Sequence, residues 1–194
     1  MKAARFLAIL LFVTVISPVV SATPSGLTYT GSTWTSSPDK GSIISINSNQ
    51  TLIAAAHDDH VALYDTGSLQ LVSTFQFERV SALEFSPDGS LLAVNKGATF
   101  TVRESLVLID VDDSTILPQD AIADDKAAEI AWNSDGTVIA APGESGDIDL
   151  FRTVDMSLKS TLSGVHNSEI TCIDYSADGK WIISGDESGR YAIW

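Results

Sequence analysis

The densest group of ligand-type side chains in the sequence is the segment HDDH, at residues 57–60. Two imidazoles and two carboxylates within four residues could coordinate a divalent metal ion, because histidine nitrogen and carboxylate oxygen are both common ligands. The segment also falls at an expected turn between two strands, where polar residues are needed in any case. His57, Asp58, Asp59 and His60 are therefore candidate ligands, although we expect no resident metal or other cofactor.

Patterns of enzymatic chemistry are absent from the sequence. A serine nucleophile elbow needs Gly-x-Ser-x-Gly, and GESGD at residues 143–147 fails at its last position. The segment DVDDST at residues 110–115 resembles the start of a calcium loop, but the required glycine is missing and Ala121 stands at the twelfth position, where glutamate belongs. The sequence contains no glycine-rich phosphate-binding loop. It therefore predicts no catalytic residues.

The elements that would position any such residues repeat along the chain. Each copy consists of an aromatic residue, a polar turn with Asp-Gly and an apolar run. Copies begin at Phe85 (FSPDGSLLAV), Trp132 (WNSDGTVIAA) and Tyr175 (YSADGKWIIS), and a divergent copy begins at Ile46 (INSNQTLIAA). The four starting points are 39, 47 and 43 residues apart. Such a period is typical of architectures that stack one supersecondary unit on the next.

Each repeat predicts a small β-sheet. In the third repeat, residues 128–163, the segments AEIAWN, TVIAAP, DIDLF and LKSTLS are separated by turn sequences such as SDG and GESG. In these turns aspartate tolerates the bend and glycine supplies a positive φ. The second and third strands are nearly continuous apolar runs, which indicates burial on both faces. Radial stacking of sheets buries both faces, so we predict an all-β fold of the β-propeller type with four-stranded antiparallel blades.

The fourth repeat, LSGVHNSEITCIDYSADGKWIISGDESGRYAIW, resembles the WD40 repeat, and the resemblance extends over residues 42–194. His166 stands where the family has its histidine. The residues that close the third strands are Tyr64, Ile109, Phe151 and Trp194. In that family a buried network of His, Asp, Ser or Thr, and Trp often locks a blade, so the resemblance implies a network wherever its members are present.

The match to that network is uneven. Asp58 matches the aspartate position in the first repeat, whereas Ser145 and Ser188 stand at that position in the third and fourth repeats. Only the fourth repeat has the histidine, His166. These departures place the chain closer to the wider propeller group than to the strict WD40 class.

The repeats predict blades at residues 42–79, 80–127, 128–168 and 169–194, with the last blade lacking its outermost strand. Closed propellers have four to eight blades, so about three and a half blades predict an incomplete ring that belongs to a longer protein. Two alternatives stay open. One is a four-blade ring completed by residues 27–34, within the Ser/Thr/Gly-rich lead at residues 23–41. The other is closure by dimerisation.

Two candidate sites lie on loops of this scaffold. The second repeat carries about five extra residues in NKGATFTVRES, residues 95–105, and this insertion holds Phe100 and Arg103. Loops that vary on a rigid scaffold often bind partners, so these two residues form a candidate binding loop, the alternative being a simple hairpin extension. Asn49-Gln50-Thr51, on the turn of the first repeat, is an N-glycosylation acceptor if the host glycosylates exported proteins.

Residues 1–22 have the features of a secretory signal peptide. Lys2 and Arg5 precede an apolar run of 15 residues, and small residues follow at the expected cleavage site. The run is shorter than the roughly 20 residues that span a bilayer. We therefore expect a mature chain that begins near Thr23, has no membrane span and is extracellular or periplasmic.

Charge and cysteine content restrict the partners and the chemistry further. The formal net charge is −14, and the acidic residues are spread through the repeats. Nucleic acid binding needs a basic face and is therefore not expected. An acidic surface favours solubility, and a salty habitat or a basic partner would also fit. The single cysteine, Cys172, has no internal disulfide partner and lies in an expected strand, where we predict a buried, unreactive thiol.

The resemblance implies an exported, non-catalytic protein-interaction scaffold whose partner is a protein or a cell-surface ligand. The alternative is the propeller half of a larger exported enzyme or sensor, with the catalytic or signalling part outside this chain. More blades in a longer reading frame would favour the scaffold, and a hydrolase or kinase-like segment would favour the alternative.

Overall fold

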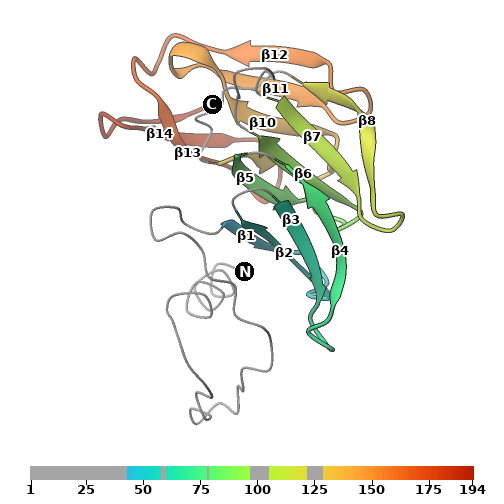
Figure 1. Ribbon diagram of the computed structural model, residues 1–194. Coiled ribbons are helices and arrows are strands. Elements are labelled where there is room, and N and C mark those ends of the chain that lie inside the picture. The colour runs from blue at the N-terminus through green and yellow to red at the C-terminus, as the bar shows by residue number, and fades with distance from the viewer. Residues whose placement is uncertain (1–42, 58–59, 78, 97–104, 122–128) are drawn as a thin grey trace, which may run out of the picture.

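The computed structural model describes residues 43–57, 60–77, 79–96, 105–121 and 129–194. These residues form antiparallel β-sheets that follow one another along the chain, with a single 3-10 turn as their only helical element. Figure 1 shows the sheets arranged in the manner of successive propeller blades. The predicted all-β propeller fold is confirmed.

Three blades have four strands and the fourth has three. The first blade holds β1 (Ile43–Ile46), β2 (Leu52–His57), β3 (His60–Asp65) and β4 (Leu71–Gln76). The second holds β5 (Val80–Phe85), β6 (Leu91–Lys96), β7 (Ser105–Asp110) and β8 (Thr115–Ala121). The third holds β9 (Ala131–Trp132), β10 (Val138–Pro142), β11 (Ile148–Arg152) and β12 (Leu158–Leu162), with the 3-10 turn η1 (Glu144–Gly146) between β10 and β11. The fourth holds β13 (Ile170–Tyr175), β14 (Ile182–Asp186) and β15 (Tyr191–Ile193).

The Asp-Gly turns join the first and second strands of the blades, as predicted. Gly89, Gly136 and Gly179 have φ values of 81°, 73° and 69°, which a residue with a Cβ resists. In the second blade the Ser86 hydroxyl donates a hydrogen bond to Asp88 at 2.6 Å. This bond and the amides around it hold the pKa of Asp88 below its usual value, and a donor hydroxyl does the same in the third and fourth turns. The turns are therefore closed by their own side chains.

The hydrophobic core consists of three clusters, each between two consecutive blades. Between the first and second blades Leu63 and Phe75 pack with Leu92 and Ile109. Between the second and third blades Leu106 and Leu108 pack with Trp132 and Phe151. Between the third and fourth blades Ile148 and Leu150 pack with Ile173 and Ile182. The predicted burial of both sheet faces is thus confirmed for the second and third blades.

Each blade has a leading face, which packs on the preceding blade, and a trailing face, which packs on the following one. The aromatic residue at the end of the first strand lies on the leading face, as Phe85 and Trp132 do. Among the described residues, no buried cluster joins the trailing face of the fourth blade to the leading face of the first. The described blades therefore form an open series.

The prediction of a buried Cys172 is wrong. The residue lies in β13 as expected, but its side chain is exposed. The reason is its position on the trailing face of the fourth blade, which none of the described blades covers. A strand pattern predicted the alternation of faces correctly and could not predict which face would find a neighbour.

Within the described part of the chain, no helix has the length and apolar character that would let it cross a membrane. The expected signal peptide at residues 1–22 and the lead at residues 23–41 lie outside the described residues. Their assignment stays a prediction.

Candidate functional site

A serine, a histidine and an aspartate come together inside the fourth blade. His166 lies in the connection between β12 and β13, Ser184 lies in β14, and Asp186 ends that strand. The His166 Nδ1 atom donates to Asp186 Oδ2 at 2.9 Å, because a carboxylate can only accept. His166 Nε2 accepts a hydrogen bond from the Ser184 hydroxyl at 2.7 Å. This is the order of contacts found in serine hydrolases, where the histidine activates the serine.

Burial prevents the cluster from acting on a substrate. Ser184 is 1% exposed and His166 is 3% exposed. The Ser184 oxygen also accepts a hydrogen bond from Trp194 Nε1 at 2.9 Å. The hydroxyl is therefore already engaged both as a donor and as an acceptor. A nucleophile must reach a carbonyl carbon, and this hydroxyl is enclosed. The cluster therefore joins the connection before β13 to β14 and to Trp194, and its serine is not placed to attack a substrate.

The carboxylate of Asp186 is held in its ionised form by its neighbours. The Ser188 hydroxyl donates to Asp186 Oδ1 at 2.6 Å, and the Arg190 amide donates to the same oxygen at 3.0 Å. These bonds, led by that of Ser188 and joined by the imidazole of His166, hold the pKa of Asp186 well below its usual range, although burial opposes them. A fixed negative charge in turn fixes the tautomer of His166.

The sequence places Ser188 at the family's aspartate position in the fourth blade, but another residue supplies the carboxylate. Asp186, not Ser188, is the carboxylate that contacts His166, and Ser188 supports it from two residues further along. In the third blade the matching position is Gly143, since Gly143 and Asp186 each open the turn by donating to a carbonyl four residues later. The sequence does show an aspartate directly after the small residues of β14, and this was the signal that was missed. The register of β13 with β14 then places that aspartate beside the histidine.

The connection that carries His166 is held against the third blade. Gly146, with φ of 85°, leaves so little room that an added Cβ would lie 2.7 Å from the Ser168 carbonyl oxygen and 3.0 Å from His166 Cβ. The cluster thus ties the third blade to the fourth. Its hydrogen bonds lock the fourth blade to the connection that precedes it, and the resemblance implied such a lock within a blade.

The sequence of this blade matches a known family. The family model described as WD domain, G-beta repeat, matches residues 156–194, which include the whole buried cluster. The fourth blade is thus similar to the WD40 repeat, and the chain has the β-propeller-like arrangement of repeated sheets. The match covers the fourth blade together with the last strand of the third, and the repeated strands and turns extend the likeness to the other blades.

Curated relatives agree with this assignment. The WD repeat-containing protein AAC3 of Dictyostelium discoideum is 22% identical over 152 residues, which are 75% of this chain and 30% of that protein. The human serine-threonine kinase receptor-associated protein is 26% identical over 145 residues, 73% of this chain and 39% of its own length. ROOT INITIATION DEFECTIVE 3 of Arabidopsis thaliana is 32% identical over 65 residues, 34% of this chain and 15% of that protein. The WD40-like chain thus spans less than half the length of these relatives.

The predicted metal ligands come together only in part. In the first blade β2 ends at His57 and β3 begins at His60, and these two residues are paired across the hairpin. Asp58 and Asp59 lie outside the described residues, as does the match of Asp58 to the WD40 aspartate. The described residues hold no group of three or more His, Cys, Asp or Glu side chains that could bind a metal. The HDDH segment stays a candidate only in the sequence.

Of the two loop candidates, Asn49 lies among the described residues and the loop with Phe100 and Arg103 does not. Asn49 is exposed on the turn between β1 and β2, and its Oδ1 accepts hydrogen bonds from the hydroxyl and the amide of Thr51, at 2.6 and 3.1 Å. Its role as a glycan acceptor stays a prediction. Phe100 and Arg103 lie outside the described residues, between the end of β6 and the start of β7.

Proposed function

We propose that this WD40-like protein is an exported, non-catalytic protein-interaction scaffold. Its relatives carry names that describe WD repeats or association with another protein, as in the receptor-associated relative. WD-repeat proteins generally act by presenting surfaces and not by catalysis, which supports a scaffold here. Association of that relative with a receptor kinase is a property of that protein alone.

The observation that carries the proposal is how the blade uses its reactive groups. The Ser184, His166 and Asp186 side chains have the order of a hydrolytic triad, yet all three are enclosed and satisfy one another. Such a network stiffens the blade, because buried polar groups that are fully hydrogen-bonded specify one packing. A stiff scaffold holds its surface loops in fixed positions, which favours binding.

One rim of the series is the best candidate for the partner surface. The connection between β6 and β7, which holds Phe100 and Arg103, joins the second strand of its blade to the third. The connection between β10 and β11 does the same in the third blade, and antiparallel pairing brings the ends of β6 and β10 to the same rim. An aromatic and an arginine side chain are the types enriched where binding energy concentrates. We therefore assign partner binding to this rim.

A double variant tests the assignment. Phe100→Ala with Arg103→Ala should abolish capture of partner proteins by the tagged, exported chain, compared by mass spectrometry with the unaltered chain. The matched control is Val154→Ala with Lys159→Ala, which removes an exposed apolar residue and an exposed cation on β12 and the turn before it, away from this rim. Equal capture by all three chains would place the partner surface elsewhere. Capture lost by the control alone would reverse the assignment.

Export is the second part of the proposal and has its own test. The chain expressed with its natural leader should be recovered outside the cytoplasm, and mass spectrometry should find an N-terminus at or near Thr23. Replacing Leu10 and Leu11 in the apolar run with arginine should retain the chain inside the cell. Recovery of intact Met1 on a membrane-bound chain would contradict export by cleavage.

A further inference from the structure

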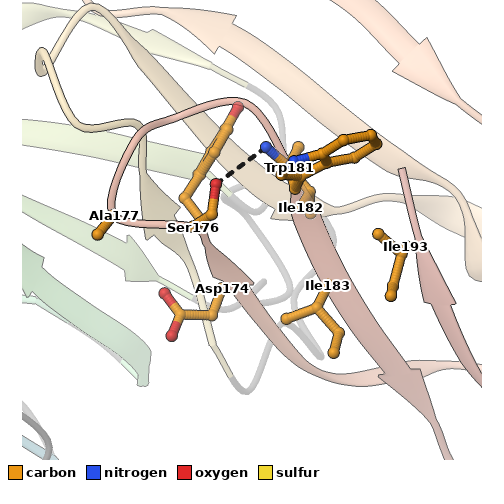
Figure 2. A pocket seen from close by; sticks show the side chains of 8 residues that line it. Asp174, Ser176, Ala177, Trp181, Ile182, Ile183 and Ile193 are labelled. Atoms are coloured by element: carbon orange, nitrogen blue, oxygen red, sulfur yellow. Dashed lines mark hydrogen bonds between the residues drawn. The ribbon is translucent and has the colours of Figure 1, made fainter.

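The turn that joins β1 to β2 has the same hydrogen-bonded frame as its counterparts in the other blades. In the first blade Asn47 Oδ1 accepts the amide that lies five residues later, that of Leu52, at 2.9 Å. Figure 2 shows the same bond in the fourth blade, where Ser176 Oγ accepts the Trp181 amide at 3.0 Å. The second and third blades repeat this bond. The four turns are therefore equivalent parts of one repeated structure.

The first turn carries an amide where the other three turns carry a carboxylate. Asn49 takes the place of three aspartates, Asp88, Asp135 and Asp178. In the third turn Asp135 Oδ1 accepts the Thr137 amide at 2.9 Å and the Thr137 hydroxyl at 2.5 Å. In the first turn Asn49 Oδ1 accepts the same two groups of Thr51, at 3.1 and 2.6 Å. The exchange of carboxylate for amide thus leaves the turn and its hydrogen bonds in place.

This exchange creates an acceptor for an N-linked saccharide. Asn49 is the only asparagine in the sequence that is followed two residues later by serine or threonine. Asn49, Gln50 and Thr51 are all exposed. Among the described residues, the hydrogen bonds of the turn use the Oδ1 atom of Asn49. A glycosylated asparagine keeps this oxygen and loses only one Nδ2 hydrogen, so the modified residue still closes the turn.

The four turns lie in a row along one rim of the blades. A Cβ at Gly89 of the second turn would lie 3.5 Å from Asn47 Cβ of the first, and one at Gly136 of the third would lie 3.7 Å from Pro87 Cδ of the second. We call residues 47–51, 86–90, 133–137 and 176–180 the turn rim. Strand β6 begins at this rim and has six residues, a length of about 20 Å. The rim assigned above to partner binding lies at its other end.

We propose that the exported chain carries an N-linked saccharide on Asn49, which occupies the turn rim and leaves the opposite rim to the partner. The proposal rests on the proposed export, because the modification belongs to exported proteins. The donor is a saccharide attached to a lipid through a diphosphate. Asn49 Nδ2 forms a bond to the anomeric carbon and gives up one proton to solvent. The bond from that carbon to the diphosphate oxygen breaks, and the lipid diphosphate leaves with the electron pair.

The mass of the exported chain tests the modification. The chain recovered outside the cytoplasm of its own host should exceed the mass of its polypeptide by one saccharide, and mass spectrometry of its peptides should place the addition on Asn49. Asn49→Asp should have the polypeptide mass alone. This variant is matched, because it gives the first turn the carboxylate with which the third turn makes the same bonds, and circular dichroism should show an unaltered fold. An exported natural chain without the addition would overturn the proposal.

A second leader separates this proposal from the proposed export. An established cleavable leader in front of Thr23 should deliver the chain into the export pathway of yeast, which glycosylates exported proteins. If the natural leader fails and this chain carries the saccharide, export is contradicted and Asn49 is still the acceptor. In the same cells Asp135→Asn should add a second saccharide, because it gives the third turn the residue order of the first. Modification of the third turn alone would overturn the proposal.

A saccharide moved to the other rim tests the assignment of the two rims. Glu169→Thr makes Asn167 an acceptor, in the connection between β12 and β13. This connection lies beside η1, since a Cβ at Gly146 would be 2.7 Å from the Ser168 carbonyl oxygen.

Glu169→Thr, once its mass shows the second saccharide, should lose the partners that the natural chain captures. Asn49→Asp should keep them. Glu169→Gln is the matched control, because it changes the same side chain without creating an acceptor, and should also keep them. Loss of capture by Asn49→Asp would mean that the partner binds the saccharide itself, which overturns the assignment, as would full capture by the doubly modified chain.

Discussion

The third and fourth blades share their strand order and their Asp-Gly turns, yet their trailing faces have opposite environments. Ile148 of β11 is 0% exposed, whereas Ile193 of β15 is 65% exposed. Both are isoleucines on the third strand of a blade, and both follow the alternation of a strand. The difference comes from the neighbour: the fourth blade covers Ile148, and no described blade covers Ile193. Strand pattern decides which face a side chain joins, and stacking decides whether that face is buried.

The largest effect is expected from truncating these two isoleucines. Ile148→Ala should lower the free energy of unfolding by about 2–5 kcal/mol, because it leaves a cavity in the core between two blades. Ile193→Ala should change it by less than about 0.5 kcal/mol, since an exposed side chain has little packing to lose. Urea unfolding of both variants, at a concentration low enough for the chain to be monomeric, measures the difference. Equal losses would show that the fourth blade is covered within one chain.

The buried cluster gives the next largest effect. His166→Ala should cost about 1–3 kcal/mol, because Ser184 and Asp186 both lose a hydrogen-bond partner inside the protein. Val165→Ala is the control, as Val165 precedes His166 in the same connection and is 44% exposed. Thermal unfolding should separate the two variants clearly. If they melt together, the cluster does not tie the third blade to the fourth.

The turns should distinguish strain from crowding. Gly136→Val should cost roughly 1–3 kcal/mol, because a β-branched residue resists a positive φ. Gly136→Ala and Gly179→Ala share that strain, but a Cβ at Gly179 would lie 2.6 Å from Ser134 Oγ, while the nearest atom to one at Gly136 is 3.7 Å away. Gly179→Ala should therefore be the more costly alanine variant by about 1 kcal/mol. Adding Ser134→Ala to Gly179→Ala should remove this extra cost. If the unfolding midpoint of Gly179→Ala stays the same when Ser134→Ala is added, crowding by Ser134 is not the cause.

Acid should weaken the fourth blade through Asp186. Its pKa is lowered in the fold, so its contribution to stability is complete above the usual aspartate pKa near 3.9 and is lost as the pH falls from there toward the folded value. The unfolding free energy of the natural chain should therefore fall more steeply below about pH 4 than that of Asp186→Asn. Chemical denaturation from pH 6 to pH 2 compares the slopes. Parallel slopes would mean that Asp186 titrates as it does in the unfolded chain.

Much of the fold was predictable from the sequence because the repeats are local signals. The Asp-Gly turns, the apolar second and third strands and the closing aromatic residues each depend on neighbours within a few positions. The register of Asp186 was not predictable in the same way. Ser188 and Asp186 are both polar residues near the same turn, and only the pairing of β13 with β14 places Asp186 beside His166.

The candidate sites were predicted less well than the fold. The sequence singled out the HDDH segment and a loop with Phe100 and Arg103, because residue type and length are visible there. It identified His166 only through the family resemblance, and not its partner Ser184. Ser184 is an ordinary serine in a strand until two other segments enclose it. Residues that act through long-range contacts carry no local mark.

The sequence by itself determined the blade: its period, its strand order, its turn conformations and the alternation of its faces. These features follow from steric limits on the backbone and from side chains that are close in the chain. Only the tertiary structure decided which faces are buried, which aspartate contacts His166 and that Cys172 is exposed. Those outcomes depend on contacts between segments far apart in sequence, where the energy of a residue is set by what packs against it and not by its own type.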